Sequence, residues 1–151
     1  MIRPARADDA VAIAELDAAT WSLDVTPSPR SSVPSSIEGM LVAEEGGEIV
    51  GYVALGRPTR LESNRHVADI RGLAVAPAHQ GRGLGRALVQ AALAAARERG
   101  ARRVTLRVLA PNTAARALYE SCGFVVEGVL RDEFLIDGRY VDDVLMARAL
   151  S

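Results

Sequence analysis

The chain has 151 residues, of which 49% are hydrophobic and 25% charged, which is typical of one globular domain spanning residues 1–151. Its formal net charge of −1 leaves no broad basic surface for a nucleic acid, and no apolar run is long enough to cross a bilayer. One cysteine, Cys122, excludes an internal disulfide, and with an N-terminus that lacks a signal-peptide core it predicts a cytoplasmic protein. All 18 basic residues are arginines, so no lysine is available for a Walker loop or a Schiff base.

The first third of the chain predicts a strand, a helix and a hairpin. After an extended segment at 1–6, residues 8–20 predict a helix capped by Asp8 or Asp9, whose apolar side carries Val11, Ile13, Ala14 and Leu16. Residues 26–36 contain three prolines and five serines, so we expect a loop there. Two strands within 40–55 flank Gly46-Gly47, a pair typical of a two-residue hairpin turn.

The rest of the chain alternates strands with two helices and ends in a second hairpin. The expected elements are a strand at 66–75, a helix at 84–99, a strand at 102–109, a short helix within 111–124, and strands at 124–136 and 139–150. Gly72 lies inside the first of these strands, which predicts a bulge or the close approach of another backbone. Asp137-Gly138 predicts the turn of the last hairpin. This order of elements indicates a mixed α/β fold.

The sequence HQGRGLGRAL (79–88) places three glycines between a predicted strand and a predicted helix. Such a loop is an anion site, because its free N–H groups converge and the helix dipole adds about half a positive charge. The absence of lysine excludes a Walker loop for a nucleoside triphosphate. Arg86 at the third glycine position, and the lack of an acidic residue ~20 residues later, argue against a dinucleotide. The third anion that we consider, the pyrophosphate of coenzyme A, meets neither objection.

Two motifs resemble those of the GNAT superfamily, the general-control-type N-acetyltransferases. LAVAPAHQGRGLGRAL (73–88) is similar to the family's acyl-CoA signature, with Gln80, Gly83 and Gly85 at the signature positions, and LRVLAPNTAARALYESCGF (106–124) is similar to the strand and helix that follow it. IRPARADDAVAI (2–13) resembles the family's opening strand and helix, and only residues 26–36 are untypical. The resemblance implies an acetyl-CoA-dependent N-acetyltransferase without a metal. It also implies a central, largely antiparallel sheet of about six to seven strands flanked by about four helices.

The residues expected to contact the cofactor lie on the strand at 66–75, in the glycine loop at 79–88 and in the short helix within 111–124. The three glycines let the main chain wrap the diphosphate, and Arg82 and Arg86 either bind phosphate oxygens or are solvated residues at the helix end. A bulge would splay the strand and free the backbone of Leu73 and Val75 for pantetheine. Asn112 bonds the cofactor, caps its helix, or does both. The full expected set is Leu73, Ala74, Val75, Gln80, Gly81, Arg82, Gly83, Leu84, Gly85, Arg86, Asn112 and Arg116.

The resemblance assigns the catalytic roles to two side chains. Tyr119 matches the family's general acid, although a tyrosine at this position also suits a core packed on Leu118 and Phe124. Asp69 matches the position of an acid, usually glutamate, on the fourth strand. It is either the base, directly or through a water, or a solvent-facing carboxylate on the face opposite Ile70. His66 is the alternative base, and Cys122 is expected to be a small buried residue rather than an acyl carrier.

The acceptor amine is predicted only by class. The resemblance places acceptor specificity in residues 21–38, including Trp21, and 130–143, and DGRYVDDVLMARAL (137–150) resembles members that act on amino acids and small amines, including the phosphinothricin-type enzymes. Four acids there either attract a cationic amine or are solvated charges: Asp132, Glu133, Asp142 and Asp143. We expect a small-molecule amine; the alternatives are a protein N-terminus or lysine, or a CoA-binding module without turnover. The resemblance also allows a homodimer through the terminal strands.

Overall fold

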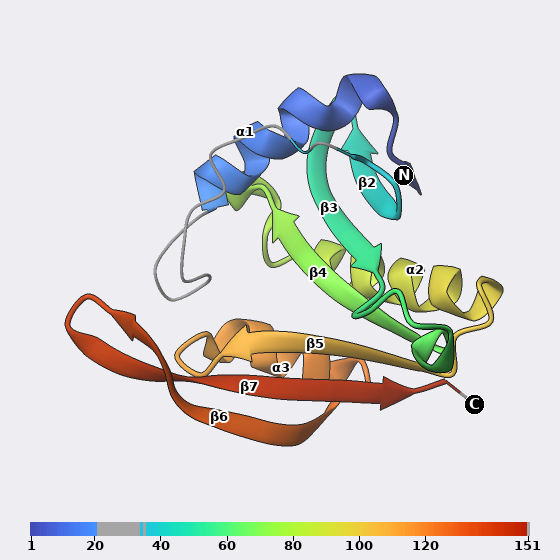
Figure 1. Cartoon of the computed structure of the whole chain (residues 1–151). Helices are drawn as coiled ribbons and strands as arrows, with labels where there is room; N and C mark the ends of the chain where they lie inside the picture. The colour runs from blue at the N-terminus through green and yellow to red at the C-terminus, as the bar shows by residue number, and fades with distance from the viewer. Residues whose placement is uncertain (21–33, 35, 151) are drawn as a thin grey trace.

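Figure 1 shows the computed structural model of the chain, which describes residues 1–20, 34 and 36–150. A seven-stranded sheet has the order β1-β2-β3-β4-β5-β7-β6, and all neighbours are antiparallel except the parallel pair β4 and β5. The strands are β1 (Ile2–Pro4), β2 (Met40–Glu45), β3 (Glu48–Gly56), β4 (Val67–Val75), β5 (Arg103–Leu109), β6 (Val125–Ile136) and β7 (Arg139–Ala149). The α-helices are α1 (Ala10–Thr20), α2 (Leu84–Glu98) and α3 (Thr113–Ser121), and 3-10 turns cover Ala7–Asp9, Glu62–Asn64 and Pro77–His79. The predicted mixed α/β, largely antiparallel fold is confirmed.

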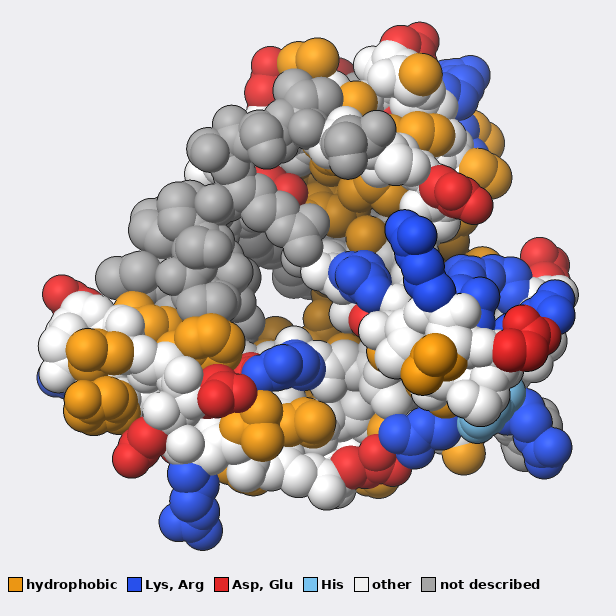
Figure 2. Space-filling view, viewed as in Figure 1, with side chains coloured by type: hydrophobic (Ala, Val, Ile, Leu, Met, Phe, Trp, Pro, Cys, Tyr) orange, Lys and Arg blue, Asp and Glu red, His pale blue; other side chains and the backbone are white. Residues whose placement is uncertain are grey.

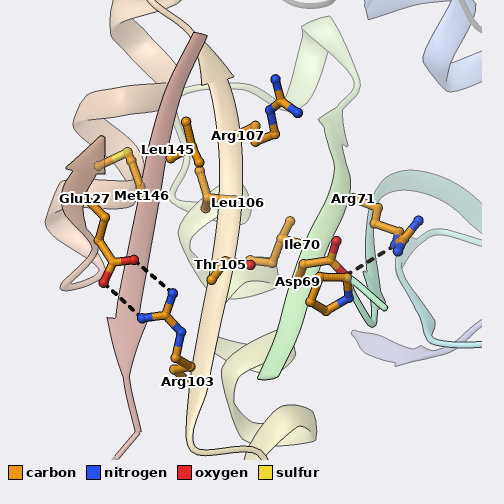
Figure 3. Close-up of a pocket in the computed structure, with 11 residues that line it drawn as sticks. Asp69, Ile70, Arg71, Arg103, Thr105, Leu106, Arg107, Glu127, Leu145 and Met146 are labelled. Atoms are coloured by element: carbon orange, nitrogen blue, oxygen red, sulfur yellow. Dashed lines mark hydrogen bonds and ion pairs between the residues drawn. The ribbon is translucent and has the colours of Figure 1, made fainter. Parts of the chain in front are cut away.

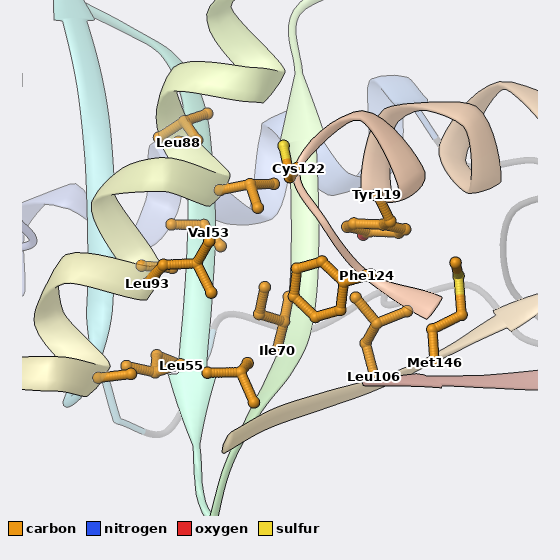
Figure 4. Close-up of a cluster of buried hydrophobic side chains, with 14 of the residues drawn as sticks. Val53, Leu55, Ile70, Leu88, Leu93, Leu106, Tyr119, Cys122, Phe124 and Met146 are labelled. Carbon is orange, nitrogen blue, oxygen red and sulfur yellow. The ribbon is translucent and has the colours of Figure 1, made fainter. Parts of the chain in front are cut away.

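The helices cover opposite faces of the sheet. On β3, Val53 packs in a cluster with α2 and α3, whereas the neighbouring Tyr52 packs with Ile13 of α1. Because side chains alternate along a strand, α1 lies on one face and the other two helices lie on the other. Figure 4 shows the larger cluster, into which α2 inserts Leu88 and Leu93. Each fully buried leucine or valine contributes roughly 1.5–3 kcal/mol of burial free energy, so this cluster holds α2 on the sheet. Within the described ranges, no helix is long and apolar enough to span a membrane.

β4 contains one extra residue. It pairs with β3 from Gly51↔Val75 to Ala54↔Gly72, but the next pair is Leu55↔Ile70, so Arg71 is the extra residue of a β-bulge. The bulge shifts the alternation of side chains. Ile70 before it and Leu73 after it therefore both pack toward α2, although they are three positions apart. The irregularity predicted from Gly72 is confirmed.

Both predicted hairpins close with two residues in the left-handed region. Gly46 and Gly47 have φ angles of 58° and 81°, and Asp137 and Gly138 have φ angles of 51° and 76°. Positive φ at both central residues matches the twist of the flanking strands, which is why such pairs predict hairpins well.

The start of α1 differs from the prediction in two respects. A 3-10 turn precedes the helix, and the Asp9 carboxylate accepts a hydrogen bond from the Arg6 backbone N–H at 2.7 Å, so Asp9 closes the first turn from within. Arg3 donates to the same carboxylate at 2.8 Å and lowers the pKa of Asp9 to about 2. Val11 is exposed rather than buried, whereas Ile13 and Leu16 are buried as predicted.

Candidate active site

β4 and β5 pair only near their N-terminal ends, from Val67↔Arg103 to Asp69↔Thr105. Beyond that point β4 continues to Val75 and β5 to Leu109 without pairing with each other, so the two strands diverge as Figure 1 shows. Backbone N–H and C=O groups in a protein interior need hydrogen-bond partners. The gap therefore suits an extended ligand with amides of its own, and the predicted splay of these strands is confirmed.

The glycine loop closes the wide end of this gap at the start of α2. Gly81 and Gly83 have φ angles of 79° and 81°, and nothing lies within 4 Å of a Cβ built on either. A Cβ on Gly85 would instead lie 3.3 Å from Leu118 Cδ2 of α3, so a side chain there would crowd the contact between α2 and α3. None of the backbone N–H groups from Gly81 to Arg86 donates to an acceptor in the described residues. A cradle of free donors at a helix N-terminus fits a phosphate group.

The side chains around the loop differ in what they already bind. Arg82 and Arg86 are exposed and make no hydrogen bond or ion pair within the described chain, so both predicted roles remain open. The Gln80 side-chain amide donates to the Val75 carbonyl at 3.0 Å and ties the loop to the end of β4. Ala74 and Leu84 pack their side chains in the two cores, which leaves only their backbones for a cofactor.

Two further residues predicted to contact the cofactor lie at the start of α3. The Asn112 side-chain oxygen accepts a hydrogen bond from the Ala115 backbone N–H at 3.2 Å, so it caps the helix as one reading predicted. Arg116 Nε is buried and has no hydrogen-bond partner among the described residues. A buried donor without an acceptor costs free energy, so Arg116 fits a site completed by an anionic or amide-rich ligand.

Tyr119, the predicted general acid, lies in the core. It is 7% exposed, and its ring meets that of Phe124 edge-to-face with 5.8 Å between centroids. Its hydroxyl has no hydrogen-bond partner among the residues that the structure describes. Burial raises the pKa of Tyr119 to about 12. The hydroxyl is therefore protonated at neutral pH and well above it.

A pocket of about 550 Å³ lies across β4, β5 and β7, where β4 and β5 begin to diverge (Figure 3). It is lined by Pro58, Asp69, Ile70, Arg71, Arg103, Thr105, Leu106, Arg107, Glu127, Leu145 and Met146. The hydrophobic residues at alternate positions of β5 pack toward α2 and α3, so the charged residues between them face the side of α1. Figure 2 shows basic and acidic side chains around a hollow on this face.

Asp69 is the predicted catalytic residue that the pocket contains. Its side chain is 19% exposed and accepts a hydrogen bond from Arg71 Nε at 3.2 Å, while Ile70 joins the core on the other face as predicted. His66 is exposed at the start of β4 and does not line the pocket. Cys122 is buried, in agreement with its predicted role as a small core residue. Trp21 and nearly all of residues 26–36 lie outside the described residues.

The sequence did not predict three arginines that line the pocket: Arg71, Arg103 and Arg107. Arg103 pairs with both carboxylate oxygens of Glu127, at 2.8 and 2.9 Å, and Arg107 pairs with Glu133 at 3.2 Å and with Asp143. Alternation along RVTLRVL was the available signal, because it places 103, 105 and 107 on one face. Of the four acids named from the sequence, Glu133 and Asp143 are thus engaged with Arg107, and the Asp142 carboxylate accepts from the Asp132 N–H at 2.9 Å. Among the described residues, no group of His, Cys, Asp and Glu side chains could hold a metal ion.

Comparison with known proteins decides the family. The model of the acetyltransferase (GNAT) family matches residues 11–124. The L-amino acid N-acyltransferase MnaT of Escherichia coli K12 is 32% identical over 96% of this chain and 91% of its own. The chain belongs to the GNAT family. A phosphinothricin N-acetyltransferase of Alcaligenes faecalis is 35% identical over 74% of this chain and 56% of its own.

A solved GNAT structure supports the assignment of the donor. A putative acetyltransferase from Salmonella typhimurium, determined with its cofactor acetyl-CoA, has a TM-score of 0.87 and 26% identity, covering 100% of this chain and 94% of its own. The chain is an acetyl-CoA-dependent N-acetyltransferase, as the motifs predicted. The roles of its individual residues stay predictions.

Proposed function

We propose that this GNAT enzyme transfers the acetyl group of acetyl-CoA to the primary amine of an amino acid or a related small amine. The observation that carries the proposal is a pocket of both charge signs beside the diverging strands, with Asp69 and arginines among its lining residues. An amino acid presents an ammonium group and a carboxylate a few ångströms apart, so it needs both signs. Similarity to an L-amino acid N-acyltransferase over 96% of the chain supports the same class of acceptor.

Direct transfer in a ternary complex requires the amine to lose a proton. An alkyl amine has a pKa near 10.4, as lysine does, and is mostly charged at neutral pH. Asp69 is proposed to accept this proton, directly or through one water, because its carboxylate lines the pocket at the point where the strands diverge. Arg71, which donates to Asp69, would hold the carboxylate in place.

The other half of the reaction needs a proton donor and donors for a carbonyl oxygen. Acetyl-CoA supplies an activated acetyl thioester. The Tyr119 hydroxyl is proposed to protonate the departing sulfur, since a thiolate with a parent pKa of about 8.5 leaves more readily when a proton is offered. Backbone N–H groups of Leu73 and Val75, on the part of β4 that lacks a β5 partner, are proposed to bind the carbonyl oxygen and the pantetheine amides.

The glycine loop completes the proposed donor site. The free N–H groups of Gly81 to Arg86 would bind the pyrophosphate, and Arg82, Arg86 and Arg116 would add charge. Because the side-chain oxygen of Asn112 already caps α3, Asn112 would bind the cofactor only through the rest of its amide group.

Release of coenzyme A thiol from acetyl-CoA, measured against a panel of amines, tests the acceptor class. The panel contains free amino acids, polyamines, aminoglycosides and short peptides. We expect one or more free amino acids to give the highest kcat/KM. Peptides that outperform every free amino acid would instead identify a protein-modifying enzyme, and polyamines in first place would show that the pocket selects cations.

A further inference from the structure

Arg107 differs from the other pocket arginines in how its guanidinium is used. Both terminal nitrogens of Arg103 are taken by Glu127, at 2.8 and 2.9 Å. Arg71 donates to Asp69 and to the Arg57 carbonyl. Arg107 binds Asp143 through Nε and Glu133 through Nη2, while Nη1 has no partner among the described residues. Among the three arginines that line the pocket in the described part of the chain, Arg107 is therefore the one whose terminal nitrogens a single departing side chain would free.

The two partners of Arg107 are unequal. Asp143 is buried, with a side chain that is 5% exposed, and it lies on the neighbouring strand β7. Its charge needs Arg107, so this contact is fixed by the fold. Glu133 is 38% exposed and meets an arginine that is 53% exposed, with 3.2 Å between the atoms. Exposed pairs of this kind contribute little to stability and exchange easily.

β6 is built to bring Glu133 to this place. Its pairing with β7 is interrupted between Leu130 and Phe134, and Asp132 within the interruption has a φ of 53°. The Asp142 carboxylate accepts a hydrogen bond from the Asp132 N–H at 2.9 Å and holds the irregular segment. A carboxylate is thus presented to the terminal edge of Arg107 from a segment outside the regular sheet.

Arg107 also lies where an acceptor carboxylate would be expected. It is on β5 beyond Thr105, the last β5 residue paired with β4, and it lines the same pocket as Asp69. A guanidinium with Nη1 and Nη2 available binds a carboxylate through two parallel hydrogen bonds. We propose that Arg107 binds the carboxylate of the acceptor amino acid, and that Glu133 occupies this position until the acceptor replaces it. This inference rests on the proposed function and names the residue that would select a free amino acid.

The test compares each amino acid with its amide, which keeps the α-amine and lacks the carboxylate. The quantity measured is the ratio of kcat/KM for the acid to kcat/KM for the amide. Arg107→Gln should lower this ratio at least about tenfold, because a charge-assisted pair is lost only for the acid. Glu133→Gln should lower KM for the acid severalfold and leave KM for the amide unchanged, since it removes the competing carboxylate. Glu62→Gln is the matched control, because it removes the carboxylate partner of Arg65, an exposed arginine that does not line the pocket, and it should leave the ratio unchanged.

Two further variants keep the inference falsifiable if Arg107→Gln fails to fold beside buried Asp143. Arg107→Lys retains a charge for Asp143 but not the planar pair of donors, and Arg107→Gln with Asp143→Asn removes both charges together. Each should lower the ratio. Amino acids accepted with an unchanged ratio in these variants would overturn this inference alone. A wild-type enzyme that accepts only peptides or polyamines would overturn the proposed acceptor, and this inference with it.

Discussion

Tyr119 has two features that sequence reasoning treated as alternatives. Its ring is buried and stacks edge-to-face on Phe124, as a core tyrosine would. Its hydroxyl has no partner in the described chain, and burial raises the pKa of the group to about 12. Packing fixes the ring, and the hydroxyl carries a proton at neutral pH, so burial in the core is compatible with the proposed role.

Tyr119→Phe should lower kcat by about 10²-fold or more, because the proposed proton donor is lost. The melting temperature and the Kd of acetyl-CoA should change little, since the substitution removes only a hydroxyl that makes no hydrogen bond in the described chain. Steady-state kinetics and thermal melts give both values. Full turnover by the folded variant would remove Tyr119 from the mechanism.

The raised pKa of Tyr119 also predicts a pH profile. An acid with a pKa of about 12 is protonated throughout the neutral and mildly alkaline range. The wild-type kcat should therefore show no alkaline decline from this group below about pH 10. A kcat profile that declines below this pH in the wild type but stays level in Tyr119→Phe would contradict the raised pKa, because the decline would then follow the Tyr119 hydroxyl.

Asp69→Asn tests the proposed base. The asparagine keeps an acceptor for Arg71 and should leave the fold intact. The variant should lose the acidic limb of the kcat/KM profile and be slow at neutral pH, because no carboxylate remains to accept the proton from the ammonium group. Rates recorded from acid to neutral pH for both proteins decide the point. An acidic limb that persists unchanged in the variant would assign the base elsewhere.

The sequence predicted residues that belong to local motifs. It did not predict residues whose role depends on contacts between distant parts of the chain. Asp69 was predicted through the family resemblance, from its position on the fourth strand. The contact between Arg107 and Glu133 joins residues 26 positions apart and depends on an irregular stretch of β6. No local pattern reports such a pairing, so the acids of the last hairpin could be described only by their charge.

At the scale of elements, the bulge in β4 was the most informative prediction. Gly72 indicated an irregular strand, and the structure places the extra residue next to it, at Arg71. The divergence of β4 from β5 near this bulge opens the gap, and backbone groups along the gap are available to a ligand. The first helix was less predictable because DDAVAIAELDAAT is rich in alanine and has no distinct apolar face. Val11 is consequently exposed while Ile13 is buried.

The glycine loop predicts a specific loss of cofactor affinity. Gly83→Ala should weaken acetyl-CoA binding severalfold or more, because the new Cβ projects into open space at the proposed cradle. The control is a substitution at a glycine that has the same φ angle but lies away from the loop. Gly100, at the C-terminal end of α2, also has a φ of 81° with nothing within 4 Å of its Cβ. Gly100→Ala should lose comparable stability and keep its affinity, as calorimetry would measure. Equal affinities in the two variants would remove the loop from the donor site.

At the scale of the whole molecule, the order of strands was the part least accessible to local patterns. β7 lies between β5 and β6, although β6 precedes it in the chain. Hairpin signals predict that β6 and β7 pair, and they say nothing about which of the two meets β5. The resemblance to a family supplied the sheet as a whole, and the structure supplied the pairing from Arg103↔Ala149 to Leu109↔Asp143.

Acetyl-CoA should stabilise the entire fold, because its proposed site joins β4, β5, α2 and α3. At 100 times Kd the ligand adds about 2.7 kcal/mol, which corresponds to a rise in melting temperature of roughly 5–10 °C for a chain of this size. Differential scanning calorimetry with acetyl-CoA, and with NAD or ATP at equal concentration, measures this rise. Equal shifts with all three would contradict a site selective for coenzyme A.

The central claim is that this enzyme acetylates the α-amine of a free amino acid, and its most direct test is to trace the acetyl group. Isotopically labelled acetyl-CoA is incubated with the protein and a mixture of amino acids, polyamines and peptides, and mass spectrometry locates the label. We predict label on the α-amine of a free amino acid, in an amount equal to the thiol released. Label on peptides or polyamines alone, or thiol released without any N-acetylated product, would contradict the account.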